Sequence, residues 1–347
     1  MTLAQKLAAY LSGQLGRPAE VLNLDRISGG ASRETYRFVL HAPVDGAPFE
    51  RRLILRLDPP ASLIETDRRT EFAAIAAFQG SDVPVPEPLW IETDATDLGA
   101  AFMVMTEIAT GEAHPFKLMQ PPFARHSAAM GQQKWTILGA IARADPQAGG
   151  FAGIVAPVEP RACGRRELDL WEAMLDADEL EPQPIQRAAI RWLRKNPPPP
   201  AQRISIVHGD YRTGNFLVDQ DGSICGILDW EMAHLGDPLE DLAWSLNRVW
   251  HFNNDERCGG LLPKQQAIAT WEKSSGLVAD PQALYWWELF SCVKGQAIWI
   301  SAAKEFQTGK NRDSIMAVAG WMQSTSQDRA SLELLGHLQP AAAGGRA

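Results

Sequence analysis

Hydrophobic and polar positions follow two different periods along the 347-residue chain. Residues 3–14 carry leucine and alanine at helical spacing, which predicts a helix with Thr2 as its cap. From about residue 22 to 108, short alternating and apolar runs predict three strands, a helix and two more strands. Beyond residue 112 the apolar spacing is mainly helical to about residue 335. A sheet segment followed by a helical segment is typical of the α+β class.

This pattern predicts two lobes that join near residues 107–113. Residues 1–108 form the smaller, antiparallel-sheet lobe of this prediction, and residues 109–347 form the larger, mainly helical lobe. One hairpin is expected among the helices. The apolar runs 216–218 and 223–228 flank the sequence DQDG, whose Asp-Gly pair favours a tight turn.

Four polar residues stand around this hairpin: His208, Asp210, Asn215 and Asp229. An antiparallel hairpin brings its outer ends together, so we expect Asn215 to lie close to Asp229. Their amide and carboxylate oxygens are ligands that Mg²⁺ prefers. Asp210 lies in the loop that leads into the hairpin, where it can face the same cavity without binding the metal.

The spacing between Asp210 and Asn215 indicates the chemistry. It equals the spacing in the protein-kinase catalytic loop, H-x-D-x-x-x-x-N. In that chemistry the aspartate accepts the proton of the acceptor hydroxyl, while the asparagine and a later aspartate hold the metal. Gly209 replaces the arginine that follows the kinase histidine. The loop therefore predicts a site for phosphoryl transfer.

Three motifs carry a resemblance to a known family: VHGDYRTGNFLV, ILDWE and GDPLEDLAW. They resemble the aminoglycoside phosphotransferase and choline kinase superfamily, which has a bilobal protein-kinase-like fold. The motif HGDYRTGN, with WLRKNPPPP upstream, is most similar to the phosphotransferase domains related to those fused to acyl-CoA dehydrogenases. The resemblance covers residues from about 20 to 330.

The resemblance implies an ATP- and Mg²⁺-dependent kinase that phosphorylates a hydroxyl group of a small molecule. Asp210 would be the catalytic base, and Asn215 and Asp229 the metal ligands. The lobe 1–108 would bind the nucleotide, and the lobe 109–347 would hold the catalytic loop, the metal site and the substrate pocket. His208 is expected to brace the loop, and Glu231 to orient Asp229 or to reach the metal through water.

The segment GDPLEDLAW predicts its own local structure. Asp237 suits a helix cap, Pro238 the first helical position and Glu240 the capping-box position. We expect Asp237 and Asp241 to be structural and to anchor this helix behind the catalytic loop.

Two groups of residues are expected to hold the phosphates. A glycine turn between the first two strands would cover them through Gly29, Gly30, Ser32 and Arg33. An ordinary hairpin turn is the alternative, because the turn lacks the pattern G-x-G-x-x-G. The third strand, LILRL, has one interior basic residue, Arg56, at the place where the superfamily usually has lysine.

Arg56 is expected to grip the phosphates and to pair with Glu71 on the following helix. The alternatives are a surface arginine on an edge strand, and a local ion pair between Glu71 and the neighbouring Arg68 or Arg69. The backbone from Glu107 to Ala109 is expected to bind adenine. An ordinary strand end would have the same pattern.

Composition excludes several kinds of partner. The net charge is −9, from 33 basic and 42 acidic residues, which argues against binding to nucleic acid or to an anionic membrane. The four cysteines form no C-x-x-C pair, and no signal peptide or membrane span is apparent, so a cytoplasmic protein with reduced thiols is expected. The oligomeric state is left open.

The acceptor is the least defined part of the prediction. The stretch 285–306 is rich in Trp and Ile, with balanced charges, which suits neither a polycationic aminoglycoside nor a choline cage. An acceptor with an apolar body fits better, unless these aromatic residues are simply core. A nucleotide-binding pseudokinase is the alternative function, because of the arginine at position 56. A protein kinase is disfavoured, because Asp229 is followed by Trp230 and Glu231 and not by Phe-Gly.

Overall fold

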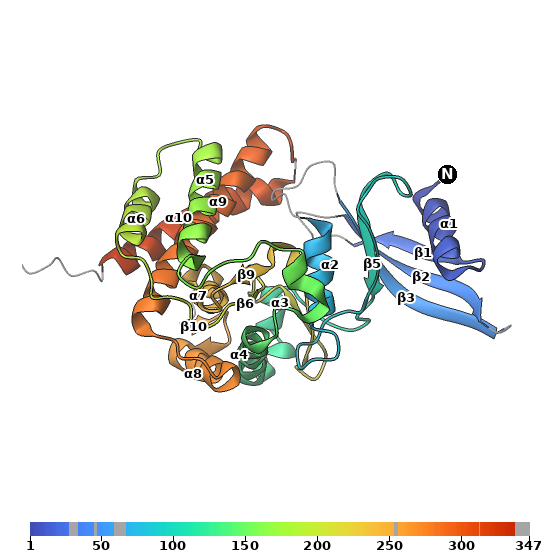
Figure 1. The fold of residues 1–347 in the computed structure, drawn as a ribbon, viewed down its shortest axis with the longest axis horizontal. Helices are drawn as coiled ribbons and strands as arrows, with labels where there is room; N and C mark the ends of the chain where they lie inside the picture. The colour runs from blue at the N-terminus through green and yellow to red at the C-terminus, as the bar shows by residue number, and fades with distance from the viewer. Residues whose placement is uncertain (28–33, 45–46, 59–66, 253–255, 312, 337–347) are drawn as a thin grey trace, which may run out of the picture.

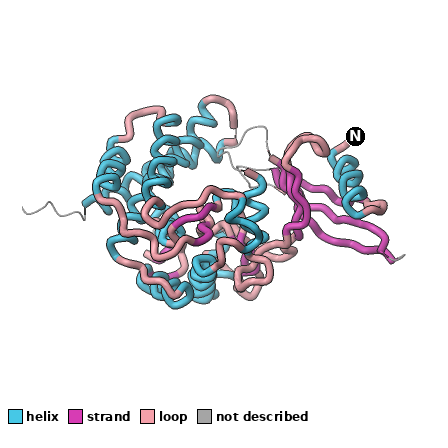
Figure 2. The backbone as a smooth tube through the Cα atoms, in the orientation of Figure 1, coloured by secondary structure: helices cyan, strands magenta, loops and turns pink. Residues whose placement is uncertain are grey.

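The structure is a computed structural model, and it describes residues 1–27, 34–44, 47–58, 67–252, 256–311 and 313–336. The chain forms a sheet-containing part at the N-terminus and a mainly helical part after it (Figure 1). Strands of the first part are grouped at one end of the molecule and helices fill the other (Figure 2). The predicted α+β class is confirmed.

The N-terminal sheet has five antiparallel strands in the order β1-β2-β3-β5-β4. Along the chain its strands are β1 (Glu20–Arg26), β2 (Glu34–Val44), β3 (Ala47–Leu57), β4 (Pro88–Glu92) and β5 (Phe102–Thr106). Helix α1 (Leu3–Leu15) precedes the sheet, and Thr2 caps it in a capping box with Gln5. Helix α2 (Arg68–Ala77) lies between β3 and β4 in sequence. The predicted order of three strands, a helix and two strands is confirmed.

The central strands β3 and β5 alternate between two cores, one on each face of the sheet. On β5, Phe102 and Val104 belong to a cluster that includes residues of α1, whereas Met103 and Met105 belong to the cluster of the helical part. Leu53, Leu55 and Leu57 of β3 join the first cluster. The period of two therefore turns the intervening residue of β3, Arg56, toward the helical part.

The C-terminal part is mainly helical. Its α-helices are α3 (Pro115–Leu118), α4 (Ser127–Arg143), α5 (Cys163–Asp178), α6 (Pro184–Lys195), α7 (Leu239–Leu246), α8 (Lys264–Ser275), α9 (Pro281–Gln307) and α10 (Ser314–Gly336). Short 3₁₀ helices are η1 (Phe123–His126), η2 (Ala148–Gly153), η3 (Trp230–Met232) and η4 (Arg248–Trp250). The prolines at 197–200 follow the end of α6, as predicted.

Three two-stranded ribbons lie among these helices. They pair β6 (Ser205–Val207) with β9 (His234–Gly236), β7 (Phe216–Val218) with β8 (Ile224–Ile227), and β10 (Arg257–Cys258) with β11 (Leu262–Pro263). The ribbon β7–β8 is the predicted hairpin, and β6 and β9 enclose it in sequence. Residues 208–215 thus connect one ribbon to the next without regular structure.

The aromatic stretch of α9 belongs to the core. Trp286, Trp287 and Phe290 are at most 2% exposed and pack against one another with ring centroids 4.9–5.6 Å apart. The alternative interpretation, that these rings are core and not an acceptor site, is therefore the right one for these three. Within the described residues, none of the helices has the length and apolarity needed to cross a membrane.

Close packing of α4 on α8 predicts opposite effects for one substitution at two glycines. A Cβ at Gly139 would lie 2.5 Å from Ser274 Cβ and 2.8 Å from the Ser275 backbone nitrogen. We expect Gly139→Ala to lower the free energy of unfolding by about 1–3 kcal/mol through overpacking. At Gly13, in α1, a Cβ would meet no atom within 4 Å, so Gly13→Ala should raise it by about 0.5–1 kcal/mol. Urea unfolding followed by circular dichroism measures both, and equal effects would contradict the packing.

Candidate active site

The hairpin β7–β8 brings the two expected metal ligands to one end. Phe216 pairs with Ile227 in the ribbon, and the Leu228 amide donates to the Asn215 carbonyl at 2.9 Å. Asn215 and Asp229 therefore flank the open end of the hairpin, as predicted. Asp229 has a left-handed backbone, with φ 61° and ψ 54°, a conformation that is uncommon for a residue other than glycine and is concentrated at functional sites.

Asp210 is held by three side chains. The Asn215 amide donates to Asp210 Oδ2 at 2.6 Å and to the Asp210 carbonyl at 2.9 Å. Trp244 Nε1 donates to Oδ1 at 2.8 Å, and Arg212 Nε lies 3.2 Å from the same oxygen. The side chain of Asp210 is 21% exposed, so the carboxylate is fixed in orientation and still accessible.

Trp244 and Arg212 belong to this site, although neither was predicted from the sequence. Arg212 lies inside the quoted HGDYRTGN motif, two positions after Asp210, and its charge was the available signal. Trp244 lies on α7, outside the loop, and nothing in its local pattern distinguishes it from a core tryptophan. Only the packing of α7 under the loop brings its indole nitrogen to Asp210.

His208 braces the loop through both ring nitrogens. Nδ1 accepts from the Asp210 amide at 3.1 Å, and Nε2 donates to the Leu228 carbonyl at 2.8 Å. The residue has no exposed surface, so it has no access to a ligand. These bonds tie the start of the loop to the end of the hairpin, in agreement with the bracing role expected for His208.

Asp241 anchors the same loop from α7. Its two carboxylate oxygens accept from the backbone amides of His208 at 2.6 Å and Gly209 at 2.9 Å. The structural role expected for Asp241 is therefore confirmed. Asp237 accepts from the Leu239 amide at 3.0 Å and from Trp287 Nε1 at 3.1 Å, so it too is structural.

The capping-box prediction for Glu240 is wrong. Its side chain is 1% exposed and turns into the interior, where Oε1 accepts from Lys294 Nζ at 2.9 Å. Lys294 on α9 also donates to the Gly209 carbonyl at 2.7 Å. A carboxylate that is buried without an opposite charge is costly, so the buried Glu240 pairs with Lys294 and does not serve as the local cap.

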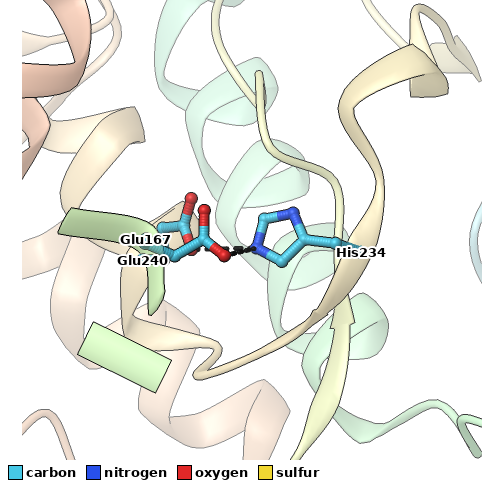
Figure 3. Close-up of side chains that lie close together, drawn as sticks. All are labelled: Glu167, His234 and Glu240. Carbon is cyan, nitrogen blue, oxygen red and sulfur yellow. Dashed lines mark hydrogen bonds and ion pairs between the residues drawn. The ribbon is translucent and has the colours of Figure 1, made fainter. Parts of the chain in front are cut away.

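Glu240 also joins a cluster with His234 and Glu167, whose side chains converge from β9, α7 and α5 (Figure 3). His234 Nε2 lies 3.0 Å from Glu240 Oε2 and 3.5 Å from Glu167 Oε1, while Nδ1 donates to the Met232 carbonyl. Burial alone would lower the pKa of His234, but the two carboxylates outweigh it and raise the pKa to about 9. Three such side chains could hold a metal ion, yet Lys294 and Arg166 already face the carboxylates. We interpret the cluster as a network of ion pairs.

Arg56 links the sheet to the hairpin. It pairs with Glu71 of α2 through Nη1 and with Asp229 Oδ1 through Nη2 at 3.0 Å, and Glu231 lies 4.0 Å away. Burial alone would lower the pKa of Arg56, but the three carboxylates outweigh it and raise the pKa above its ordinary value. Arg56 is 7% exposed and lies on a central strand, so it is not a surface arginine on an edge. Arg68 pairs with Glu71 as well, at 2.8 Å.

The residues expected at the nucleotide are placed only in part. Gly29, Gly30, Ser32 and Arg33 lie outside the described residues. The Glu107 amide donates to the Arg52 carbonyl at 3.1 Å and is therefore committed to the sheet. Within the described part of the chain, the Glu107 carbonyl and the Ala109 amide form no hydrogen bond, which leaves one acceptor and one donor for a ligand.

Asn215 and Asp229 suit a divalent cation in their donor atoms. Both hydrogens of the Asn215 amide are directed at Asp210, so its Oδ1 is left as an acceptor. Asp229 is 44% exposed and uses Oδ1 for Arg56, which leaves Oδ2. Hard oxygen atoms of this kind are the ligands that Mg²⁺ takes, with water and phosphate oxygens completing the shell.

Comparison with known proteins identifies relatives of the chain. A family model described as the phosphotransferase enzyme family matches residues 23–277. Acyl-CoA dehydrogenase family member 10 of Mus musculus is 30% identical over 255 residues, which are 69% of this chain and 22% of that protein. Acyl-CoA dehydrogenase family member 11 of Gallus gallus is 26% identical over 247 residues, which cover 70% of this chain and 30% of that protein. The chain thus spans less than a third of these relatives.

Solved structures share the fold along nearly the whole chain. A proposed aminoglycoside phosphotransferase from Ralstonia eutropha JMP134 has a TM-score of 0.74 at 21% identity, over 96% of this chain and 98% of that one. A thermostable mutant of aminoglycoside phosphotransferase APH(4)-Ia, in a ternary complex with AMP-PNP and hygromycin B, has a TM-score of 0.58 at 18% identity, over 94% and 98% of the two chains. These similarities confirm the kinase-like fold predicted from the sequence.

The His234 network predicts a loss of stability in alkali. The folded pKa of His234 is about 9 against an ordinary 6.5, so the stabilisation is complete below pH 6.5 and is lost as the pH rises through 9. The contribution of His234 to the free energy of unfolding is on the order of 1–3 kcal/mol. Between pH 6.5 and 9, the free energy of unfolding of wild type in urea should therefore fall relative to that of His234→Gln. His41→Gln, on β2 with a side chain 33% exposed, is the control and should give a curve parallel to that of wild type. A parallel curve for His234→Gln as well would contradict the assignment.

Proposed function

Because the chain belongs to the phosphotransferase enzyme family, we propose that it uses ATP and Mg²⁺ to phosphorylate a hydroxyl group of a small molecule. One observation carries the proposal. Asp210 is hydrogen-bonded to Asn215 at the open end of a hairpin whose second strand leads to Asp229 at the same end, which is the order and spacing of a base and two metal ligands.

The proposed reaction is an in-line phosphoryl transfer. The acceptor oxygen forms a bond to the γ-phosphorus of ATP, and the bond from that phosphorus to the β,γ-bridging oxygen breaks, with its electrons leaving on ADP. Asp210 accepts the proton of the acceptor hydroxyl. The hydrogen bonds from Trp244 and Asn215 hold the carboxylate in one orientation, which favours a near-attack arrangement.

The metal would be held by Asn215 Oδ1 and Asp229 Oδ2. When bound, Mg²⁺ neutralises negative charge on the phosphates. Arg56 already pairs with Asp229, so a phosphate bound at Arg56 would lie beside this metal site. The AMP-PNP in one structural neighbour supports the use of ATP.

The sheet-containing part, residues 1–108, is proposed to bind the nucleotide, and residues 109–347 to complete the site and bind the acceptor. Adenine would contact the Glu107 carbonyl and the Ala109 amide, which form no hydrogen bond within the described chain. The turn with Gly29, Gly30, Ser32 and Arg33 is proposed to cover the phosphates. Hygromycin B in the same neighbour supports a small-molecule acceptor as a class.

A nucleotide-binding module without transfer activity is the second candidate. It is favoured by Arg56, which stands where the superfamily usually has lysine. The complete set of Asp210, Asn215 and Asp229 disfavours it. Thermal-shift titration with MgATP, followed by product analysis with a panel of hydroxylated metabolites, separates the two functions: binding without turnover on any acceptor supports the module.

Asp210→Asn tests the base directly. The variant keeps the size of the side chain but cannot accept a proton, and its NH2 group faces a donor, Trp244 or Asn215. Transfer should therefore fall by about 10²–10⁴-fold while MgATP affinity changes little. Phosphoryl transfer is followed by mass spectrometry and nucleotide affinity by calorimetry. Asp221→Asn, at the exposed turn of the same hairpin, removes the same charge and should leave both unchanged. Unchanged turnover in Asp210→Asn would refute the mechanism.

Arg56→Gln tests the phosphate contact. Loss of one charge-assisted contact should weaken the binding of ATP and ADP by about 10- to 100-fold and leave the binding of adenosine unchanged. Arg51→Gln is the matched control, because Arg51 lies on the same strand and pairs on the surface with Glu87. Equal weakening of adenosine and ATP would show that Arg56 acts on the fold and not on the phosphates.

A further inference from the structure

Arg212 occupies a defined place beside the proposed base. Its Nε lies 3.2 and 3.3 Å from the two carboxylate oxygens of Asp210. Its guanidinium lies over the ring of Trp250, with 4.8 Å between Cζ and the ring centroid. A Cβ at Gly214 would lie 2.7 Å from Nη1, so glycine at this position leaves room for the group. The chain therefore fixes the guanidinium next to the base.

One edge of this guanidinium is left for a ligand. Nη1 lies 3.5 Å from the Thr213 carbonyl, whereas Nη2 forms no hydrogen bond with any described residue. The side chain is 27% exposed, so a ligand can reach it. A planar guanidinium binds carboxylate and phosphate groups especially well, because its donors match their oxygens.

Aromatic residues occur in the two segments next to Arg212, η4 and the start of α3. The Arg212 guanidinium lies over Trp250 of η4, and Arg212 Nη1 and Pro115 of α3 both lie close to Gly214. Phe252 follows Trp250 by two residues, and it contacts Phe116 of α3 with ring centroids 5.7 Å apart; Phe116 is 47% exposed. The segments next to Arg212 therefore carry apolar rings as well as the cation. Among the described residues, Asp210 itself is the sole carboxylate within salt-bridge distance of Arg212.

We propose that Arg212 binds an anionic group of the acceptor, a carboxylate or a phosphate, while the hydroxyl of the same molecule faces Asp210. The inference rests on the proposed phosphotransfer and specifies its acceptor class. A polycationic acceptor would meet a fixed positive charge at this place, whereas an anionic acceptor with an apolar body is complementary to both Arg212 and the rings.

The test compares matched ligands on the full chain with Mg²⁺ and AMP-PNP present. The probes are lactate and 3-hydroxybutyrate against their methyl esters, and glycerol 3-phosphate against glycerol. Saturation-transfer NMR and calorimetry give the affinities. We expect wild type to bind at least one anionic probe more tightly than its neutral partner. The acid and ester pairs test a carboxylate, and the glycerol pair tests a phosphate. Arg212→Gln should weaken binding of that anionic probe by about 10- to 100-fold and leave binding of its neutral partner and of AMP-PNP unchanged.

Arg248→Gln is the matched control and should change neither preference, because Arg248 is exposed and pairs with Glu333. Three results would overturn the proposal: no binding of any anionic probe, equal binding of acids and esters by wild type, or an Arg212→Gln variant that keeps the preference. Loss of turnover with every acceptor at unchanged acceptor affinity would also overturn it, since the residue would then act on the transferring phosphoryl group. Asp210→Asn should keep the anion preference, so failure of this proposal is distinct from failure of the proposed reaction.

Discussion

The buried carboxylate of Asp241 is the constraint on which the proposed site depends. Residues 208–215 have no regular secondary structure, so their backbone amides need partners from elsewhere. Asp241 supplies two of them and fixes the loop on α7. Once α7 is fixed there, Trp244 lies one turn further along the same helix and reaches Asp210. The position of the proposed base therefore follows from the packing of one short helix.

Buried charge is concentrated around this loop and not spread through the core. Lys294 and Glu240 are each 1% exposed, and Lys294 also holds the Gly209 carbonyl. On the opposite side, Arg56 connects Glu71 of the sheet-containing part to Asp229. Buried ion pairs contribute little net stability because desolvation offsets their attraction. These ion pairs instead fix the positions of side chains, because each pair includes or adjoins a proposed site residue.

Local pattern was sufficient wherever the site depends on local geometry. The alternation around DQDG predicts the hairpin, and the hairpin alone places Asn215 and Asp229 together. The contacts of Trp244, Arg212 and Lys294 could not be predicted, because they require the relative packing of α7, α9 and the loop. For Glu240 the local pattern was misleading. Its position in the sequence suits a capping box, but the side chain is buried beside Lys294 and His234 and pairs with them.

The helical part divides into a packed core and short segments next to the proposed site. The rings of Trp286, Trp287 and Phe290 on α9 are committed to the core, where a change of volume would disturb packing. Arg212 comes instead from the loop itself and lies over Trp250 of the short segment η4. Such segments tolerate substitution far better than a packed helix. Under the proposed function, acceptor choice would lie in the loop at Arg212 and the segments next to it, while α7 and the hairpin hold the proposed base and metal ligands in place.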